Sequence, residues 1–230
     1  MRIQKYLSQE GICSRREAEK LMLEGKVLVN GKVVRELGTQ IDPTKDVVKV
    51  ESSKSESSKG KITVIVNKPR GIVCSKSSEE GETIFELLPQ CKDLNIVGRL
   101  DKTSEGLLML TNDGVVARRV TGEEHSMEKE YEVDVREKVN PSKLKFFDRG
   151  MILEDGPTLP AKTRMLDNHS FRVILREGRK HQIRRMCEKL HLTVTRLKRI
   201  RIGPITLDNL KSGTSRPLTE QEVAGIKSIE

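Results

Sequence analysis

The sequence is poor in aromatic residues and contains no tryptophan. Phe, Trp and Tyr together account for 3% of its 230 residues. Because proteins that hold single-stranded nucleic acid by stacking use aromatic side chains for successive bases, stacking cannot be the main recognition device of this chain. Long apolar runs are missing too: 62–66 and 107–110 are far shorter than the roughly 20 residues that a membrane-spanning helix needs. No apolar segment follows residues 1–5, so we expect no signal peptide, no membrane anchor and a cytoplasmic protein.

Motifs for metals, nucleotides and common nucleophiles are also absent. No Cys-x-x-Cys pair occurs and the histidines are not clustered at the spacing of metal ligands, which predicts reduced, mostly buried thiols and no metal site. The glycines near residue 25 do not match a phosphate-binding loop, and there is no Gly-x-Ser-x-Gly elbow. The residues considered are Cys13, Cys74, Cys91, Cys187, His125, His169, His181 and His191.

What the sequence does have is a concentration of positive charge. The net charge is +9, from 43 Lys and Arg against 34 Asp and Glu. Between Ser170 and Arg216 there are 13 Lys and Arg but only three acidic residues, so this segment carries +10 and the remainder −1. Such a distribution is typical of a protein that binds a phosphate backbone. A solvated basic face is the alternative.

A polar stretch divides the chain into two units. Residues 51–60 contain no apolar side chain and cannot contribute to a core, which predicts a flexible linker between units 1–50 and 61–230. In the first unit, Ile3 and Leu7 lie four residues apart on one face of a short helix. A second helix follows, with a Ser14-x-x-Glu17 capping box and Gly25 as its stop. Its buried stripe is Ala18, Leu21 and Met22.

The first unit also contains the signal of a β-hairpin. Asn30-Gly31 accepts the positive φ values of a type I′ turn, which predicts paired strands at 27–29 and 32–34. A last strand is expected at 47–50. The first unit is therefore predicted to be two helices with a small sheet.

The second unit predicts an α+β fold, with short strands interleaved with helices. Asn140-Pro141 begins a helix that Gly150 stops, and another helix is expected at 180–190. The buried stripe of that later helix is Ile183, Met186, Cys187 and Leu190; Lys180 with Arg184, and His181 with Arg185, are expected to stack along its other side. Strands are predicted at 62–67, 107–111, 130–135, 171–175 and 194–202.

The segment Gly98–Gly114 places an acidic residue on a loop held by a buried strand. Glycines flank the loop, an apolar strand follows, and an Asn-Asp-Gly turn ends it. Asp101 lies on this loop, a position where functional groups are commonly presented by a rigid scaffold. On spacing alone, a helix cap or a surface acid remains the alternative.

Two sets of motifs resemble known families. The stretches 11–19 and 25–31 resemble the signature of the S4 RNA-binding domain, so residues 1–50 are expected to be one. The segment 98–114 resembles the catalytic motif of the pseudouridine synthases in the RsuA/RluB/RluE/RluF group. Further blocks that match this group in the same order are 67–71, 129–131, 177–186 and 197–203. The resemblance implies a catalytic domain over 61–230, with a mixed, largely antiparallel sheet flanked by helices.

The resemblance also implies an activity and roles for three residues. The group isomerises uridine to pseudouridine within RNA, breaking the N-glycosidic bond and rejoining the base through carbon. Asp101 matches its catalytic aspartate, Tyr131 the tyrosine against the target base, and Arg184 the basic residue that pairs with the aspartate. A guanidinium there would keep the carboxylate ionised. Attack on the sugar, attack on the base and removal of a sugar proton all remain open, and no metal or organic cofactor is required.

The target base must leave its stack to react, so basic residues are expected to hold the flanking RNA backbone. The candidates are Arg15, Arg16, Lys20, Arg99, Arg179, Lys180, Arg185, Arg196, Lys198, Arg199 and Arg201. Two stretches, 11–18 and 185–188, are most similar to the RluF branch of the group, which implies a uridine of 23S ribosomal RNA. The alternatives are a 16S rRNA synthase of the same family, a non-catalytic ribosome-assembly factor, and a metal-dependent nuclease using Asp101 and Asp113. We expect the protein to be a monomer.

Overall fold

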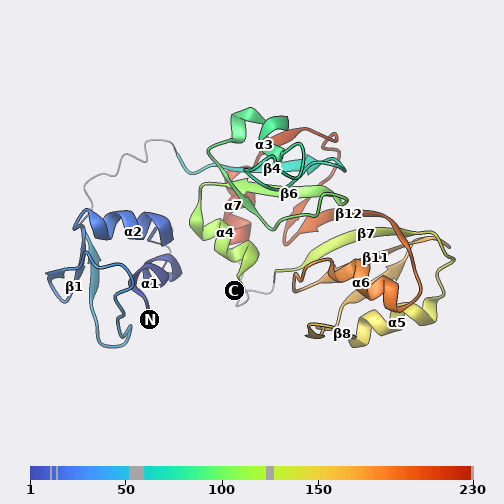
Figure 1. Ribbon diagram of the computed structural model, residues 1–230, viewed down its shortest axis with the longest axis horizontal. Helices are drawn as coiled ribbons and strands as arrows, with labels where there is room; N and C mark the ends of the chain where they lie inside the picture. The colour runs from blue at the N-terminus through green and yellow to red at the C-terminus, as the bar shows by residue number, and fades with distance from the viewer. Residues whose placement is uncertain (11, 14, 52–59, 123–126, 229–230) are drawn as a thin grey trace.

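Two separate bodies make up the molecule in the computed structural model (Figure 1). The structure describes residues 1–10, 12–13, 15–51, 60–122 and 127–228. Ser14 and nearly all of the predicted linker, residues 52–59, lie outside the described residues. In the described part of the chain, none of the helices has the length and apolar character needed to span a bilayer.

The N-terminal body is built from two helices and a three-stranded antiparallel sheet. Its elements are α1 (Ile3–Gln9), α2 (Arg15–Leu23), β1 (Val27–Val29), β2 (Lys32–Val33) and β3 (Val48–Val50), with sheet order β2-β1-β3. The predicted hairpin is confirmed, since Asn30 and Gly31 have φ of 51° and 79°. Ile3, Leu7, Ala18 and Met22 are fully buried in its core, whereas Leu21 is only partly buried. This body therefore has a hydrophobic core of its own.

A nine-stranded mixed sheet forms the centre of the larger body. Its strands are β4 (Thr63–Lys68), β5 (Asn95–Val97), β6 (Glu105–Thr111), β7 (Lys129–Val135), β10 (Lys162–Met165), β11 (Ser170–Leu175), β12 (Val194–Ile202), β13 (Ile205–Thr206) and β14 (Ser215–Pro217). The main order is β10-β11-β7-β12-β6-β4-β14, with β13 paired to β12 and β5 to β6. Every named pair in this sheet is antiparallel except β6 with β12. A short hairpin of β8 (Ile152–Leu153) and β9 (Gly156–Pro157) lies apart from it.

Helices cover both faces of the sheet, which explains the fully apolar run in β6. Leu107 and Met109 join a core with residues of α4 (Gly114–Thr121) and α7 (Glu220–Lys227). Leu108 and Leu110 join the other core with residues of α3 (Ile84–Leu87), α5 (Pro141–Arg149) and α6 (Gln182–Lys189). A short 3-10 helix at Pro89–Cys91 follows α3. The predicted α+β class, with a largely antiparallel sheet flanked by helices, is confirmed.

One of the two predicted helices of this body is confirmed and the other begins later than expected. Asn140 accepts a hydrogen bond from the Ser142 amide at the start of α5, and Gly150, with φ of 80°, follows its end. The later helix, α6, begins at Gln182 rather than at residue 180 because His181 adopts a left-handed conformation, with φ of 53°. The expectation that Lys180 and His181 stack on a helical face is therefore wrong. The four cysteines are free thiols, three of them buried.

Candidate active site

The loop that carries Asp101 is held at both ends by backbone geometry. Gly98 has φ of 65°, which glycine adopts at little cost, and directs the chain away from β5. Within the loop the Ser104 amide donates to the Asp101 carbonyl at 3.0 Å, and the Gly71 amide donates to the Lys102 carbonyl at 2.8 Å. The loop then enters β6. Asp101 is therefore presented by a tight turn between β5 and the buried strand β6.

Gly106 allows β6 and β12 to approach each other next to this loop. It has φ of 99° and pairs with Arg199 in the parallel register. A Cβ atom at this position would lie 2.2 Å from the Arg199 carbonyl oxygen, closer than any real contact. Only glycine fits here, which gives a structural reason for one residue of the motif.

The side chain of Arg199 ties the two ends of the loop together. It is 1% exposed, its Nε donates to the Leu107 carbonyl at 2.7 Å, and its Nη2 donates to the Gly98 carbonyl. Its guanidinium carbon lies 5.9 Å from the centre of the Tyr131 ring, within cation–π range. The structure thus places Arg199 inside the protein, which differs from the phosphate contact expected at the surface.

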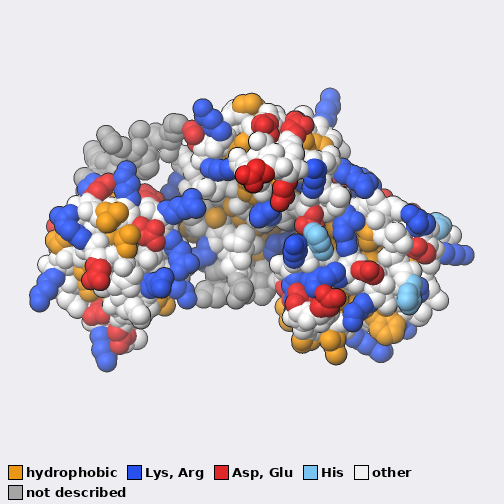
Figure 2. All heavy atoms as spheres, viewed as in Figure 1, with side chains coloured by type: hydrophobic (Ala, Val, Ile, Leu, Met, Phe, Trp, Pro, Cys, Tyr) orange, Lys and Arg blue, Asp and Glu red, His pale blue; other side chains and the backbone are white. Residues whose placement is uncertain are grey.

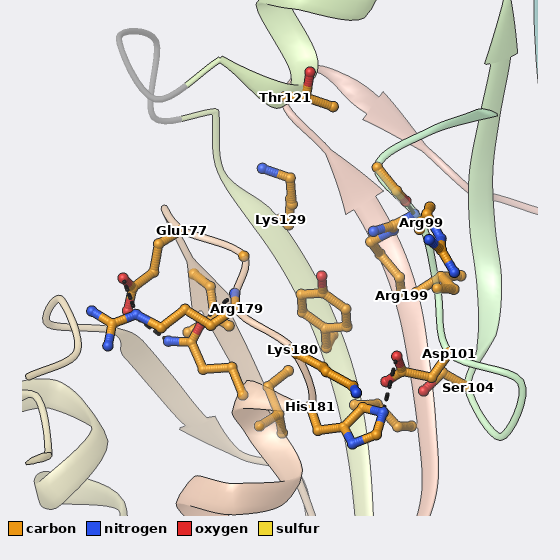
Figure 3. A pocket seen from close by; sticks show the side chains of 18 of the residues that line it. Arg99, Asp101, Ser104, Thr121, Lys129, Glu177, Arg179, Lys180, His181 and Arg199 are labelled. Carbon is orange, nitrogen blue, oxygen red and sulfur yellow. Dashed lines mark hydrogen bonds and ion pairs between the residues drawn. The ribbon is translucent and has the colours of Figure 1, made fainter. Parts of the chain in front are cut away.

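A cavity of about 500 Å³ lies between the Asp101 loop, β7, β12 and the segment before α6. Asp101 and the phenol-bearing ring of Tyr131 both line it, and Tyr131 is 9% exposed in a core position on β7. Figure 3 shows Asp101 facing this cavity from the loop, with Lys129 and Arg199 on neighbouring strands. The structure therefore brings together Asp101 and Tyr131, two of the three residues expected to form the site.

The nearest basic partner of Asp101 is a histidine that was not expected at the site. The Nε2 atom of His181 lies 3.4 Å from Oδ1 of Asp101, and the two side chains are 48% and 36% exposed (Figure 3). His181 reaches Asp101 because its left-handed backbone ends the preceding loop just before α6. From the sequence alone, this residue is considered only as a possible metal ligand or a helix-surface residue. The one available signal is that histidine, like Asn and Asp, is enriched among non-glycine residues with a left-handed backbone.

Arg184, on α6, contacts the backbone of the Asp101 loop. Its Nη2 donates to the Thr103 carbonyl at 3.2 Å, and among the described residues it forms no ion pair with Asp101. Burial lowers the pKa of Arg184, and the negative charge of Asp101 opposes this shift, so the two groups still interact through space. The direct Arg184–Asp101 contact expected from the resemblance is replaced by a contact to the loop backbone.

Lys129 is a further titratable residue of the cavity wall. It is half-buried on β7, two residues before Tyr131, and its Nζ donates to the Met127 carbonyl at 3.1 Å. Burial, together with the positive charge of Arg199, lowers the pKa of Lys129 to about 8. A cation is thus held in a partly dry wall without a carboxylate partner among the described residues.

Most of the basic residues expected to bind RNA are engaged within the protein. Arg185 binds Asp155 through two bonds of 2.8 and 2.9 Å, and Arg201 binds Glu130 at 2.8 Å. The remaining engaged pairs are Arg179 with Glu177, Arg196 with Glu105, and Lys20 with Glu24. In the described part of the chain, the structure gives no ion pair for Arg15, Arg16, Arg99, Lys180 or Lys198. The basic residues that are free to bind RNA phosphates are therefore fewer than the sequence count suggests.

The described residues hold no group of three or more His, Cys, Asp or Glu side chains that could bind a metal ion. Asp113, expected as a metal ligand only in the nuclease reading, is 2% exposed and caps α4 by accepting from the Val115 amide at 3.0 Å. Asp101 and Asp113 therefore do not form a shared cluster.

Comparisons with known proteins agree with this architecture. A family model described as RNA pseudouridylate synthase matches residues 62–189, and a model of the S4 domain matches residues 1–48. A crystal structure of a pseudouridylate synthase superposes with a TM-score of 0.72 at 32% identity, covering 98% of this chain and 99% of that one.

Curated relatives match over nearly the full chain. An RNA pseudouridine synthase of Aquifex aeolicus, described as uncharacterized, is 41% identical over 97% of this chain and 92% of its own. Ribosomal large subunit pseudouridine synthase B of Bacillus subtilis is 34% identical over 99% and 96%. Dual-specificity RNA pseudouridine synthase RluF of Escherichia coli K12 is 35% identical over 100% and 80%.

The fold and these matches define an RNA-modifying isomerase with an attached RNA-binding domain. The chain belongs to the RNA pseudouridylate synthase family, and within it to the RsuA/RluF-type pseudouridine synthases that carry an S4 domain and act on RNA. The 34% and 35% identities to the two named bacterial enzymes do not distinguish between them.

Proposed function

We propose that this chain converts a uridine of 23S ribosomal RNA to pseudouridine, with Asp101 as the nucleophile. The observation that carries the proposal is the half-exposed Asp101 carboxylate at a cavity of about 500 Å³ whose wall includes the Tyr131 ring. A relative named for the ribosomal large subunit supports the choice of 23S over 16S rRNA. A 16S uridine is the second candidate.

The reaction is an isomerisation, so it consumes no co-reactant. The bond from C1′ of the ribose to N1 of uracil breaks, a bond from C1′ to C5 forms, the C5 proton leaves and N1 gains a proton. A carboxylate can form a covalent intermediate with the nucleotide and release it later. The proposal places Asp101 in this role and leaves open whether it attacks the sugar or the base or first removes a sugar proton.

The target uridine must be extruded from its stack to enter the cavity. Extrusion costs on the order of a few kcal/mol, which contacts to the flipped base have to offset. Tyr131 offers its ring to that base, and the guanidinium of Arg199 behind the ring holds it in place. The remaining proposed RNA contacts are Arg15, Arg16, Lys20, Arg99, Lys180 and the residues engaged in ion pairs, Arg179, Arg185 and Arg201.

Two basic residues lie near the Asp101 carboxylate in the site. The imidazole Nε2 of His181 lies 3.4 Å from the carboxylate, and Arg184, which donates to the Thr103 carbonyl, contributes a positive charge. In this proposal Arg184 positions the loop through Thr103 and acts on Asp101 through space. The enzyme works as a monomer in the cytoplasm, without a metal or an organic cofactor.

Replacing the carboxylate tests the catalytic assignment directly. We expect Asp101→Asn to abolish pseudouridine formation on protein-free rRNA while RNA affinity stays within a few fold. Asp208→Asn is a matched control, because Asp208 is exposed and its φ of 45° suits asparagine. Full activity of Asp101→Asn would overturn the assignment.

A comparison of cellular rRNA with and without the gene tests which rRNA is the substrate. Pseudouridine maps of 23S and 16S rRNA from a strain lacking the gene, compared with the parent, should differ at a 23S position. A missing pseudouridine in 16S rRNA would support the second candidate. Unchanged maps in both would instead favour an RNA-binding assembly factor without catalysis.

A further inference from the structure

A second cavity lies between the N-terminal body and the catalytic domain. Its volume is about 720 Å³, and its walls come from α1 and α2 on one side and from α4 and the end of β6 on the other. Figure 1 shows α1 beside α4 with the two bodies facing each other there. We refer to this space, lined by Lys5, Arg15, Arg16, Asn112, Arg118 and Thr121, as the interdomain cavity.

Four cations line the interdomain cavity without a visible counter-charge. Lys5 belongs to α1, Arg15 and Arg16 to α2, and Arg118 to α4. Among the described residues the structure gives none of the four an ion pair, and the Nε atom of Arg118 is buried without a hydrogen-bond partner. Figure 2 shows Lys and Arg side chains gathered where the N-terminal body faces the rest of the molecule.

Among the described residues that line the interdomain cavity, Asp113 is the one acidic residue, and it does not offset these cations. Asp113 is 2% exposed, pairs with Lys227 at 2.7 Å and lies 3.9 Å from Lys61. Despite its burial, the hydrogen bonds from Lys227 and from the Val115 amide lower the pKa of Asp113. Its negative charge is therefore already matched inside the catalytic domain, and the described residues that line the interdomain cavity carry a net positive charge.

The contrast with the C-terminal segment is informative. There, Arg185, Arg196 and Arg201 are bound to carboxylates at 2.8 to 2.9 Å, although this segment dominates the charge of the sequence. Like charges that face a shared space without counter-charges repel one another, and a polyanion that enters the space relieves this repulsion. A polyanion should therefore bind at the interdomain cavity rather than at the C-terminal arginines, which are already paired with carboxylates.

The interdomain cavity adjoins the active-site cavity. Thr121, at the end of α4, lines both, and the consecutive residues Asn95 and Ile96 of β5 line one each. Figure 3 shows Thr121 at the edge of the active-site cavity, beyond Lys129. The two cavities therefore lie next to each other and share Thr121 as a wall residue.

From these observations we propose that the interdomain cavity holds backbone phosphates of the RNA strand that continues from the target uridine, with Arg15, Arg16 and Arg118 as the contacts. The inference rests on the proposed activity on RNA and adds the path of the strand. It also assigns a binding role to Arg118 of the catalytic domain, so that the two domains grip one segment of RNA together. Neither domain alone completes this site.

The test compares two triple variants of the full-length protein. Arg15→Gln/Arg16→Gln/Arg118→Gln removes three charges from the interdomain cavity. Lys145→Gln/Arg149→Gln/Arg164→Gln removes three exposed charges from α5 and β10, at the opposite end of the molecule. Binding to 23S and 16S rRNA transcripts is measured from 50 to 200 mM salt, because each lost phosphate contact reduces the slope of log affinity against log salt by about 0.7 to 0.9.

We expect the cavity variant to lose about tenfold in affinity and about 2 in salt slope, and the control variant to match the wild type. Equal slopes and affinities for all three proteins would overturn the inference. Because Arg118 is partly buried, its replacement could also disturb folding, so the double variant Arg15→Gln/Arg16→Gln, which changes two exposed residues, is measured as well. Its salt slope should fall by about two thirds of the reduction seen in the triple variant.

Failure of this inference and failure of the proposed function give different results. If the wild-type protein forms pseudouridine in rRNA but the cavity variant binds RNA as tightly and with the same salt slope, the enzyme assignment stands and the strand path is wrong. If the wild-type protein forms no pseudouridine but the cavity variant shows the reduced slope, the RNA path stands for a binding protein without this activity.

Discussion

The imidazole Nε2 of His181 lies 3.4 Å from Oδ1 of Asp101, and the His181 backbone is left-handed, with φ of 53°. A residue with a Cβ atom rarely adopts this conformation, and such residues cluster where function imposes them. Here the left-handed conformation accompanies the approach of the imidazole to the loop that carries Asp101. We interpret His181 as a positioning residue that orients the Asp101 carboxylate.

Substitution of His181 should therefore reduce the rate of the chemical step more than substrate binding. We expect His181→Ala to lower kcat about ten- to a hundredfold, since small displacements of a reacting group cost rates of this order. His181→Asn, which tolerates the same backbone and retains a hydrogen-bond donor, should recover part of the loss. Single-turnover pseudouridine formation at saturating RNA measures both.

His191 provides a matched control for this experiment. It also has a positive φ, of 54°, but it follows α6 and does not line the active-site cavity. His191→Ala should leave kcat within about twofold of the wild type, because loss of a surface side chain is usually minor. An equal effect of both substitutions would reduce the role of His181 to folding.

Loss of the buried guanidinium of Arg199 should destabilise the catalytic domain. Arg199→Gln leaves the Leu107 and Gly98 carbonyls without their donors, and each unsatisfied buried group costs about 1–3 kcal/mol. We expect a loss of about 2–5 kcal/mol in chemical denaturation. Arg196→Gln, which removes an exposed ion pair with Glu105, should cost less than about 1 kcal/mol. Comparable losses would contradict the structural role of Arg199.

A methyl group at Gly106 should be tolerated poorly. Gly106→Ala combines a positive φ with a Cβ atom that meets the Arg199 backbone, so β6 and β12 must separate. Gly156 has a similar φ of 108° but nothing near its Cβ position, so Gly156→Ala isolates the conformational cost alone. We expect the Gly106 variant to lose at least about 2 kcal/mol more than the Gly156 variant in denaturant titrations.

The partly buried charge of Lys129 in the wall of the active-site cavity predicts that the stability of the folded protein depends on pH. The pKa of Lys129 is about 8 in the folded protein, below its ordinary value, so the unfolded chain binds more protons between these two values. Burial of the charge therefore costs stability in full below pH 8, and the cost declines as the pH rises toward about 10. Lys129→Met should be more stable than the wild type at pH 7.

The advantage of Lys129→Met should shrink by about 1–3 kcal/mol between pH 7 and pH 10. Lys145→Met, at an exposed position of α5, should show no such change relative to the wild type. Thermal denaturation across this pH range checks both variants. A constant difference between Lys129→Met and the wild type would show that Lys129 is not held in a desolvated position.

Elements that depend on local signals could be predicted from the sequence. The Asn30-Gly31 turn and the Asn140 cap act through hydrogen bonds and dihedral angles within a few residues, and both occur where expected. The apolar run before Asn112 likewise predicts a strand buried on both faces. The motif around Asp101 was informative because its glycines serve the geometry of a loop and of a strand crossing.

The arrangement of the site depends on contacts that sequence spacing does not reveal. The start of α6 is fixed by Gln182, which donates to Glu177 at 2.6 Å and accepts from the Arg179 amide at 3.2 Å. These bonds hold the segment before the helix in a loop and leave His181 beside Asp101. Helical periodicity extends through residue 180 and gives no sign of this interruption.

The net charge of residues 170–216 does not by itself predict which surface is free to bind RNA. The carboxylates that bind the arginines of β12, such as Glu105 and Glu130, belong to strands that are distant in sequence. Only the pairing of β12 with β6 and β7 brings them together. Arg118, by contrast, lies in a segment of no unusual charge and faces the interdomain cavity.

The parallel pairing of β6 with β12 has a consequence for synthesis of the protein. The Arg199 side chain donates to the Leu107 and Gly98 carbonyls, which flank the loop that carries Asp101 and lie 92 and 101 residues before Arg199 in the chain. During translation, the first half of the catalytic domain leaves the ribosome without these contacts. The nascent chain therefore lacks both the hydrogen bonds of Arg199 and the partner strand of β6 until β12 has been synthesised.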